Sequence, residues 1–288
     1  MRPKTVGLIA HTGKTGAADL TRAVAEEFAR KSVNVLVEEA TANIARLVSA
    51  GSAAKIAQAS ELLVVLGGDG TLLNAVAQCG TSGRKFFGIN IGSLGFLNCA
   101  NSSGYREAID AIADGRVRYS ERILLEVRLM VGEKVVSKAD ALNDAVISRG
   151  DLSRLIRLWT RINGEPLTEF NADGLIIATP TGSTAYSLSA GGPILEPESG
   201  VFVITPICPH ALTNRSVIVS DSSEVEVGPA RKRNPIFLSV DGRPPERIPE
   251  DGVVHIRRSR HKVQLGFLPD LTFFSVLRQK LKWSGSNL

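Results

Sequence analysis

Residues 62–71 read Leu-Leu-Val-Val-Leu-Gly-Gly-Asp-Gly-Thr, in which five apolar residues are followed by two glycines and an aspartate. A short, continuous apolar run that ends at glycines is typical of a strand buried on both faces of a parallel sheet. Similar strands are predicted at Val6–Ala10, Val33–Val37 and Phe86–Ile91. Helices are predicted between strands, from Asp19 to Phe28 and from Leu72 to Gln78. This alternation predicts an N-terminal α/β domain with a parallel sheet that is covered on both faces.

Further along the chain the pattern changes to one of strands. Apolar residues alternate with charged ones from Leu125 to Val131, and Asn163-Gly164 predicts a tight hairpin between Ile156–Ile162 and Leu167–Phe170. Other strands are expected at 201–205, 216–219, 224–227, 236–240, 253–256 and 263–267. We therefore predict an α/β plus all-β fold, with an α/β domain over 1–100, a β-rich domain over 101–271, and a C-terminal helix over 272–288 that packs back on the first domain.

Composition excludes several classes of protein. The chain has 288 residues, a net charge of +5 and a pI of about 9.2, which fits an anionic ligand such as a nucleotide and equally fits a mildly basic surface. Two basic clusters, 231–233 and 257–262, lack the interleaved aromatic residues of nucleic-acid-binding surfaces, so we interpret them as solvated strand and loop ends. Three widely spaced cysteines predict no disulfide framework or zinc site, and no apolar run is long enough to span a membrane. We expect a cytoplasmic protein.

The glycine-rich loop after residue 66 suggests a phosphate site. Open α/β sheets bind ligands at the carboxyl ends of their strands, and glycines let phosphates approach backbone N–H groups. A helix from Leu72 would direct its N-terminus at the same place. Asp69 would repel phosphates unless it binds a metal ion or accepts a proton, and both roles belong to phosphoryl transfer. A simple Gly-Asp-Gly turn is the alternative, and the loop lacks the ending of a Walker A motif.

Two downstream segments carry further polar groups. Asn143-Asp144 pairs an amide with a carboxylate, which suits a ribose or a cation, although the same dipeptide is common in turns. Residues 171–193 are rich in Ser, Thr and Gly around Tyr186, which indicates a backbone-lined pocket.

In order and spacing, these motifs resemble those of the bacterial NAD kinases. The resemblance rests on Gly67–Thr71, on Asn90–Leu97, on Asn143-Asp144, and on Asp173 through Pro193. It covers almost the whole chain, from Val6 to Phe274. The glycine-rich loop alone is shared with diacylglycerol and sphingosine kinases, whereas the segment Pro180–Pro193 is specific to the NAD kinases.

The resemblance implies that the adenosine ribose 2′-hydroxyl of NAD is phosphorylated to give NADP. The donor is ATP or polyphosphate, and a divalent cation (usually Mg²⁺) is required. The resemblance further implies an N-terminal Rossmann-like domain and a C-terminal all-β domain with the site between them, in a homodimer or homotetramer. Asp69 corresponds to the general base, and the donor loop comprises Gly67, Gly68, Gly70 and Thr71. The NAD-binding residues implied are Asp69, Gly70, Asn143, Asp144, Arg154, Asn171, Asp173, Thr184, Ala185, Tyr186, Ser189 and Arg243. The resemblance implies no particular metal ligands.

Several positions depart from the family pattern. Asp144 replaces the more usual glutamate and loses one methylene, Asn171 replaces a basic residue of some relatives, and Arg243 replaces a Gln, Asn or His. These changes affect the choice between NAD and NADH and between donors, rather than the reaction class. Two alternatives remain: a lipid kinase that uses the same loop, which the Ser/Thr-rich pocket argues against, and a non-catalytic NAD(P) sensor, which Asp69 argues against.

Overall fold

The computed structural model describes residues 2–80, 83–92, 95–150, 155–211, 213–230 and 234–283. The chain forms two units, of which the first comprises Met1–Glu121 and Lys262–Leu288 and the second Arg122–His261. Two long strands, β7 (Arg118–Val131) and β18 (Gly252–Phe267), begin in one unit and end in the other. Within the described residues, no helix is long and apolar enough to cross a membrane.

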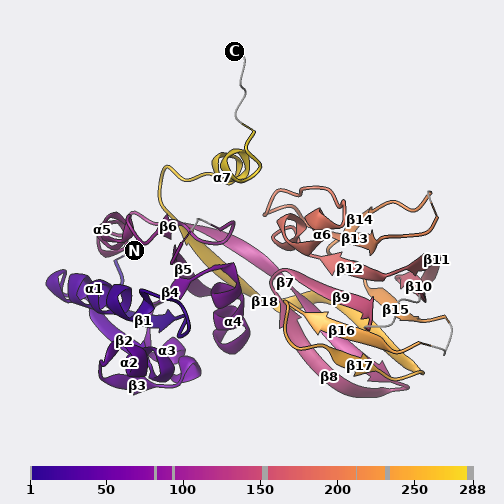
Figure 1. Ribbon diagram of the computed structural model, residues 1–288, viewed down its shortest axis with the longest axis horizontal. Helices are drawn as coiled ribbons and strands as arrows, with labels where there is room; N and C mark the ends of the chain where they lie inside the picture. Colours follow the sequence, from indigo (N-terminus) through magenta and orange to yellow (C-terminus); the bar gives the residue numbers. More distant parts are fainter. Residues whose placement is uncertain are drawn as a thin grey trace, which may run out of the picture. The chain divides into compact units, whose positions relative to one another are not determined.

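A parallel sheet forms the centre of the first unit (Figure 1). Its strand order is β5-β4-β1-β2-β3, and β6 and the end of β18 both pair in parallel with β5. The strands are β1 (Thr5–Ala10), β2 (Asn34–Glu38), β3 (Ser49–Gly51), β4 (Leu62–Gly67), β5 (Arg84–Asn90) and β6 (Ala100–Asn101). All six residues of β4 are buried, as its continuous apolar run predicts, because strands flank it on both sides and helices cover the sheet.

The described residues of the same unit form six helices. They are α1 (Ala17–Arg30), α2 (Glu39–Ala45), α3 (Ala53–Ala59), α4 (Asp69–Cys79), α5 (Tyr105–Ala113) and α7 (Phe273–Lys280). Our patterns predicted neither α2 nor α3, because each has only seven residues and takes its start from a cap, the side chain of Glu38 or of Ser52. Helix α4 begins at Asp69, three residues earlier than its apolar pattern predicted.

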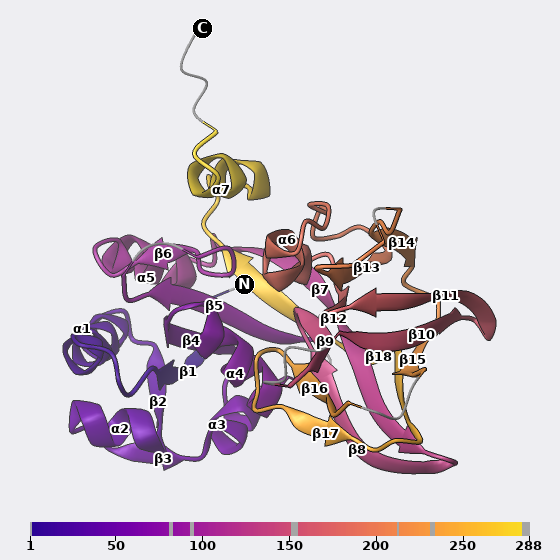
Figure 2. The same cartoon turned by 45° about the vertical axis from the view of Figure 1, so that its right-hand side comes forward.

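Two antiparallel sheets pack face to face in the second unit (Figure 2). One has the order β14-β13-β12-β9-β16-β17. Its strands are β9 (Asp144–Arg149), β12 (Gly174–Ala178), β13 (Val201–Ile207), β14 (Val217–Ser220), β16 (Ile236–Val240) and β17 (Glu246–Ile248). The other is the antiparallel part of a 12-stranded sheet, which continues from β18 to β5 and the parallel strands. It contains β7 and β18 together with β8 (Lys134–Ala141), β10 (Ile156–Ile162), β11 (Glu165–Ala172) and β15 (Val225–Pro229).

Alternating residues of the six-stranded sheet serve two separate cores. On β12, Leu175 and Ile177 face the opposing sheet, whereas Ile176 and Ala178 pack in a second cluster with Leu195. The segment after β12, which contains η1 (Gly182–Thr184) and α6 (Tyr186–Ser189), lies near that second cluster. Because side chains alternate along a strand, the central strands are buried on both faces.

Two strand predictions can be compared directly with the structure. The hairpin at Asn163-Gly164 is confirmed, since β10 and β11 pair around it and both residues have positive φ, 52° and 81°. The strands predicted at 253–256 and 263–267 are wrong as separate elements, because β18 runs unbroken through the charged residues between them. Pairing with β15 at its start and with β5 at its end provides hydrogen-bond partners for this strand.

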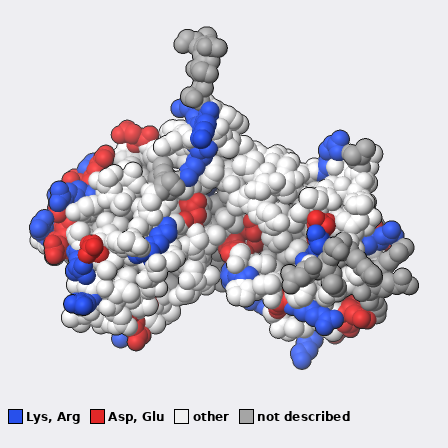
Figure 3. All heavy atoms as spheres, viewed as in Figure 1, with Lys and Arg blue, Asp and Glu red and all other residues white. Residues whose placement is uncertain are grey.

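Charged side chains of both signs are interspersed over the face shown in Figure 3. In the basic cluster 257–262, Arg257, Arg258 and Lys262 each form ion pairs with carboxylates. The other cluster, 231–233, lies outside the described residues.

Candidate functional site

The glycine-rich segment forms the junction between β4 and α4. Gly68 is the N-cap of α4 with an extended backbone (φ −98°, ψ −174°), and no side chain caps the helix. The N–H groups of Thr71 and Leu72 both donate to the carbonyl of Gly68 (3.0 and 3.2 Å), so those of Asp69 and Gly70, at the very start of the helix, are the ones available to an anion. Gly67 is required by packing, because a Cβ there would lie 2.2 Å from Thr71 Oγ1, whereas a Cβ on Gly70 would meet nothing within 4 Å.

Asp69 is the first residue of α4, and a neighbouring segment holds its carboxylate. Oδ2 accepts a hydrogen bond from the N–H of Phe96 (2.9 Å), and Oδ1 accepts from the N–H of Leu97 (3.3 Å) and from Asn98 Nδ2 (2.5 Å). A Cβ on Gly95 would lie 1.9 Å from Oδ1, so only glycine allows the approach. The motif 90–97 thus positions Asp69, although its Ser93 and Leu94 are outside the described residues.

A cavity of about 560 Å³ opens beside this junction, within the first unit. It lies at the carboxyl ends of β1, β2 and β4, the edge at which open α/β sheets bind ligands. Its lining comprises Ile9, Ala10, His11, Thr12, Lys14, Glu38, Ala40, Ala53, Gly68, Gly70, Thr71, Asn74, Ala75 and Gln78. Three of the four predicted donor-loop residues therefore line it, and the fourth, Gly67, packs against the side chain of Thr71.

In the second unit, Asn143 and Asp144 stand at the start of β9, and a third residue holds them there. The carboxylate of Asp241 accepts hydrogen bonds from three successive N–H groups, those of Leu142 (2.7 Å), Asn143 (2.8 Å) and Asp144 (3.1 Å). Asp241 has a left-handed backbone, φ 50°, in the turn after β16. Asp241 thus holds together residues that lie 97 to 99 positions away in the sequence, a relation that no local pattern predicts.

Burial and charge act together on the Asp144 carboxyl group. Asp144 is only 5% exposed. Burial, and then the nearby charge of Asp241, raise its pKa to about 7. Burial also raises the pKa of Asp241, although its three N–H donors and the charge of Arg243 oppose that shift. The guanidinium of Arg243 donates from Nη2 to the carbonyl of Asp140 (2.5 Å), so Arg243 belongs to this cluster.

The Ser/Thr-rich segment folds over the same residues. Thr179 donates from Oγ1 to the carbonyl of Leu142 (2.6 Å), and its N–H donates to the carbonyl of Asn143 (2.9 Å). Gly182 lies directly against the backbone of Asn143, where a Cβ would be 2.1 Å from the carbonyl oxygen. Beyond it, Thr184 and Ala185 are half-buried, and Tyr186 and Ser189 are exposed.

Asp173 lies at the opposite end of the sheet from Asp144. Pairing of β12 with β9 places Gly174 opposite Ser148 and Ala178 opposite Asp144. Asp173 and Asp144 are thus separated by the length of β9, about 17 Å at ~3.4 Å per residue. The Asp173 carboxylate accepts from Arg149 Nε (2.8 Å) and Nη2 (3.4 Å), and the backbone carbonyl of Asn171 accepts from the N–H of His210 (3.0 Å).

The structure therefore sorts the residues of the second unit into two clusters. Asn143, Asp144 and Arg243 form one with Asp241, and Asp173 forms the other with Arg149, with Asn171 two residues before Asp173 on β11. The sequence offered no signal for Arg149, which is one of several arginines in the strand region. Arg154 lies outside the described residues.

Comparisons with known proteins agree with this architecture. The family model of the ATP-NAD kinase N-terminal domain matches residues 6–117, and that of the ATP-NAD kinase C-terminal domain matches residues 142–266. The chain is 39% identical to the NAD kinase of Solibacter usitatus (strain Ellin6076) over 97% of this chain and 98% of the relative. It is 38% identical to that of Desulforamulus reducens over 96% and 97%.

Two solved structures share the fold. Yeast NADH kinase complexed with NADH superimposes with a TM-score of 0.89 at 26% identity, covering 98% of this chain and 88% of that one. An NAD kinase from Archaeoglobus fulgidus in complex with ATP gives a TM-score of 0.73 at 22% identity, covering 98% and 100%.

Proposed function

The chain belongs to the NAD kinase family, whose members phosphorylate NAD to NADP, and we propose that it transfers the terminal phosphoryl group of ATP to the adenosine ribose 2′-hydroxyl of NAD. In this reaction the hydroxyl oxygen bonds to the γ-phosphorus, the bond from that phosphorus to the bridging oxygen breaks, and ADP leaves. The hydroxyl proton goes to Asp69.

The fixed carboxylate of Asp69 is the observation that carries this proposal, because Asp69 stands between Gly68 and Gly70, which both line the cavity. Three neutral donors from the 96–98 segment set its orientation, and Gly95 makes room for it. Among the described residues, no lysine or arginine forms an ion pair with Asp69, so the carboxylate keeps acceptor capacity for a hydroxyl proton.

The cavity supports ATP as the donor. Its phosphate end is formed by Gly68, Gly70 and Thr71 after β4, and its other end reaches Glu38 after β2. Strand β1 lies between β4 and β2, so these ends are two strand spacings apart, or about 10 Å. A nucleoside beyond the phosphates has room there. Glu38 binds the N–H groups of Ala40 and Thr41, which fixes its carboxylate at that end.

A divalent cation is part of the proposal, and the residues fit one carried by the donor. No group of three or more His, Cys, Asp or Glu side chains in the described part of the chain could hold an ion. Mg²⁺ commonly binds through one or two carboxylates together with substrate phosphates, rather than in a protein cage. Asp69 is the carboxylate beside the phosphate end, and the cation would supply charge neutralisation to the phosphates.

For NAD we propose the two clusters of the second unit. Asn143 and Asp144 contact the ribose, Thr184, Ala185, Tyr186 and Ser189 contact the dinucleotide, and Arg243 supports the first cluster. Asp173 and Asn171, about 17 Å away along β9, suit the distant half of an extended dinucleotide. Arg154 remains an NAD-binding residue by resemblance alone. We also propose a cytoplasmic homodimer or homotetramer, which size-exclusion chromatography with light scattering would test.

A coupled assay tests the function. Purified protein is incubated with NAD, ATP and Mg²⁺, and NADP is measured. Parallel reactions replace ATP with polyphosphate, NAD with NADH, or NAD with diacylglycerol vesicles. We expect NADP with ATP. Lipid phosphorylation without NADP would support the lipid kinase, and NAD binding without turnover would support the sensor.

Asp69→Asn should reduce kcat about 10²- to 10⁴-fold, the range for a positioned general base. The isosteric amide keeps the shape but cannot take the proton. Asp19→Asn is the matched control, because Asp19 is also in the first turn of a helix of this unit and its side chain is 81% exposed. Equal turnover of the two variants, with equal melting temperatures, would contradict the role of Asp69.

A further inference from the structure

The loop between β1 and α1 places a lysine over the glycine-rich junction. Lys14 is half-buried, and its Nζ donates a hydrogen bond to the carbonyl of Ile91 (3.0 Å), just after β5. The same nitrogen would be 3.4 Å from a Cβ on Gly68. A Cβ at that distance would be in ordinary van der Waals contact with the ammonium, so the ammonium lies close to the start of α4. A larger residue there would push the ammonium away from the start of α4.

The charge of Lys14 is not neutralised by a carboxylate within the described residues. Other lysines of the same unit do form ion pairs, Lys31 with Asp110 (2.6 Å) and Lys262 with Glu121 (2.7 Å). An ammonium carries three N–H donors, and the Ile91 carbonyl accepts one of those of Lys14. Two donors remain, on a side chain that lines the cavity together with Gly68, Gly70 and Thr71.

The neighbouring groups attract the same kind of ligand. The uncapped first turn of α4 presents backbone N–H groups and the positive end of its dipole. Lys14 adds a full positive charge beside that end, from a different element of the chain. A ligand with several negative oxygens is the chemical class that both features recognise.

We propose that Lys14 binds the phosphate oxygens of the donor and offsets the negative charge that builds on the leaving diphosphate. This inference rests on the proposed function, because it concerns the donor side of the same reaction. Lys14 touches the substrate in this role and contacts no part of NAD. Its bond to the Ile91 carbonyl holds the ammonium over the junction before the donor arrives.

The test compares Lys14→Met, Lys14→Arg and Lys4→Met. Lys4 is an exposed lysine just before the amino end of β1, whereas Lys14 follows the carboxyl end of that strand. Kinetics are measured with ATP varied at saturating NAD, and with NAD varied at saturating ATP. We expect Lys14→Met to lower kcat/KM for ATP about 10- to 100-fold, the effect of one or two charge-assisted hydrogen bonds. The KM for NAD should change less than about threefold, Lys14→Arg should recover part of the loss, and Lys4→Met should behave as wild type.

A purely structural role for Lys14, in fastening the end of β5, predicts a different result. Lys14→Met would then melt at a lower temperature while its kcat/KM for ATP stayed within twofold of wild type, and that outcome overturns the proposal. Inorganic tripolyphosphate, used as an inhibitor competitive with ATP, isolates the phosphate contact. Its inhibition constant should rise in Lys14→Met by a factor similar to that for ATP, and an unchanged constant also overturns the proposal.

The failure of the proposed function would look different. Wild-type protein that forms no NADP refutes the proposed function, whatever the variants do. An active wild type with an unaffected Lys14→Met variant refutes the role of Lys14 alone. Calorimetric titration with ADP, in the absence of NAD, measures the same contact without turnover and should show weaker binding to Lys14→Met only.

Discussion

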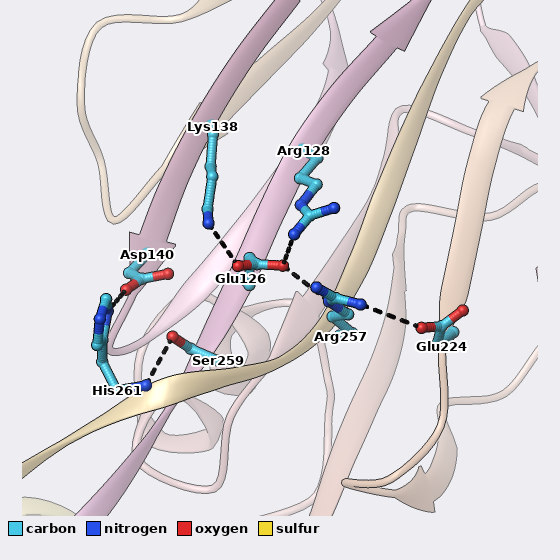
Figure 4. A network of polar contacts seen from close by, with 8 residues as sticks. All are labelled: Glu126, Arg128, Lys138, Asp140, Glu224, Arg257, Ser259 and His261. Atoms are coloured by element: carbon cyan, nitrogen blue, oxygen red, sulfur yellow. Dashed lines mark hydrogen bonds and ion pairs between the residues drawn. The ribbon is translucent and has the colours of Figure 1, made fainter. Parts of the chain in front are cut away.

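Two buried carboxylates of the second unit, Glu126 on β7 and Asp144 on β9, are placed in opposite electrostatic surroundings. The Glu126 side chain is 6% exposed and forms ion pairs with Arg128 (2.6 Å), Lys138 (2.7 Å) and Arg257 (2.7 Å), as Figure 4 shows. Asp144 is 5% exposed, and its charged neighbour is the carboxylate of Asp241.

The two environments move the two pKa values in opposite directions. Burial alone would raise the pKa of Glu126, but hydrogen bonds from Lys138 and Arg257 and the charges of Arg257 and Arg128 lower it to about 2. Burial and a like charge raise that of Asp144 to about 7. Folding therefore stabilises the charge of Glu126 and destabilises that of Asp144. Unfavourable burial of this kind is common at functional sites, whereas compensated burial serves the fold.

The largest effect on stability is expected from Glu126→Gln, which leaves three cations without their shared partner. The free energy of unfolding at pH 7 should fall by about 3 kcal/mol, while kcat stays unchanged. Urea titration measures the loss. Glu133→Gln, in the exposed turn between β7 and β8, is the matched control. A loss of activity in Glu126→Gln without a loss of stability would show that Glu126 serves the reaction rather than the fold.

Asp144→Asn should have the opposite combination of effects. We expect NADP formation to fall about 10- to 100-fold, because a neutral amide accepts ribose hydroxyls less strongly than a carboxylate. At pH 8 the free energy of unfolding should rise by about 1–3 kcal/mol, since the buried charge is removed. Asp251→Asn, at an exposed turn before β18, should change neither quantity. A variant that is both inactive and less stable would show that Asp144 is structural.

The pH dependence of stability separates the two carboxylates further. The folded pKa of Asp144 lies above its unfolded value of 3.8, so the folded state holds the extra proton between about pH 4 and 7, and Asp144 lowers stability as the pH rises through that range. The folded pKa of Glu126 lies below 4.5, so its contribution is present above that pH and is lost as the pH falls toward 2. Thermal melts at a series of pH values should show the first slope flattened in Asp144→Asn and the second in Glu126→Gln.

The smallest effect concerns the first unit, where function and stability are expected to separate at a single glycine. Gly70→Ala should raise the free energy of unfolding by about 0.5–1 kcal/mol, because alanine favours a helix and its Cβ meets no atom within 4 Å. The same methyl group would enter the cavity, so the KM for ATP should rise. Gly67→Ala, in contrast, should destabilise the fold by its clash with Thr71. An unchanged KM for ATP in Gly70→Ala would show that the donor does not bind in this cavity.

Sequence patterns located the central strand and its loop but not the environment of Asp69. The run 62–67 is buried as predicted, because five apolar residues between turn signals have few other solutions. The sequence predicted a helix from Leu72, but β4 ends at Gly67 and α4 begins directly after Gly68, so Asp69 is a helical residue. Its hydrogen-bond donors at Phe96, Leu97 and Asn98 come from another connection in the sheet, which no local pattern could relate to it.

The amino-acid sequence alone therefore determined the main parts of the protein. These are the α/β half, the strand-rich half, the glycine-rich junction and the polar segments that resemble those of the NAD kinases. Tertiary structure decided which of these residues meet. Strand pairing separated Asp173 from Asp144 by the length of β9 and brought Asp241 beside Asp144. The physical reason is range: propensity and periodicity act over a few residues, whereas hydrogen-bond partners, burial and pKa values depend on chain segments that come together only in the folded protein.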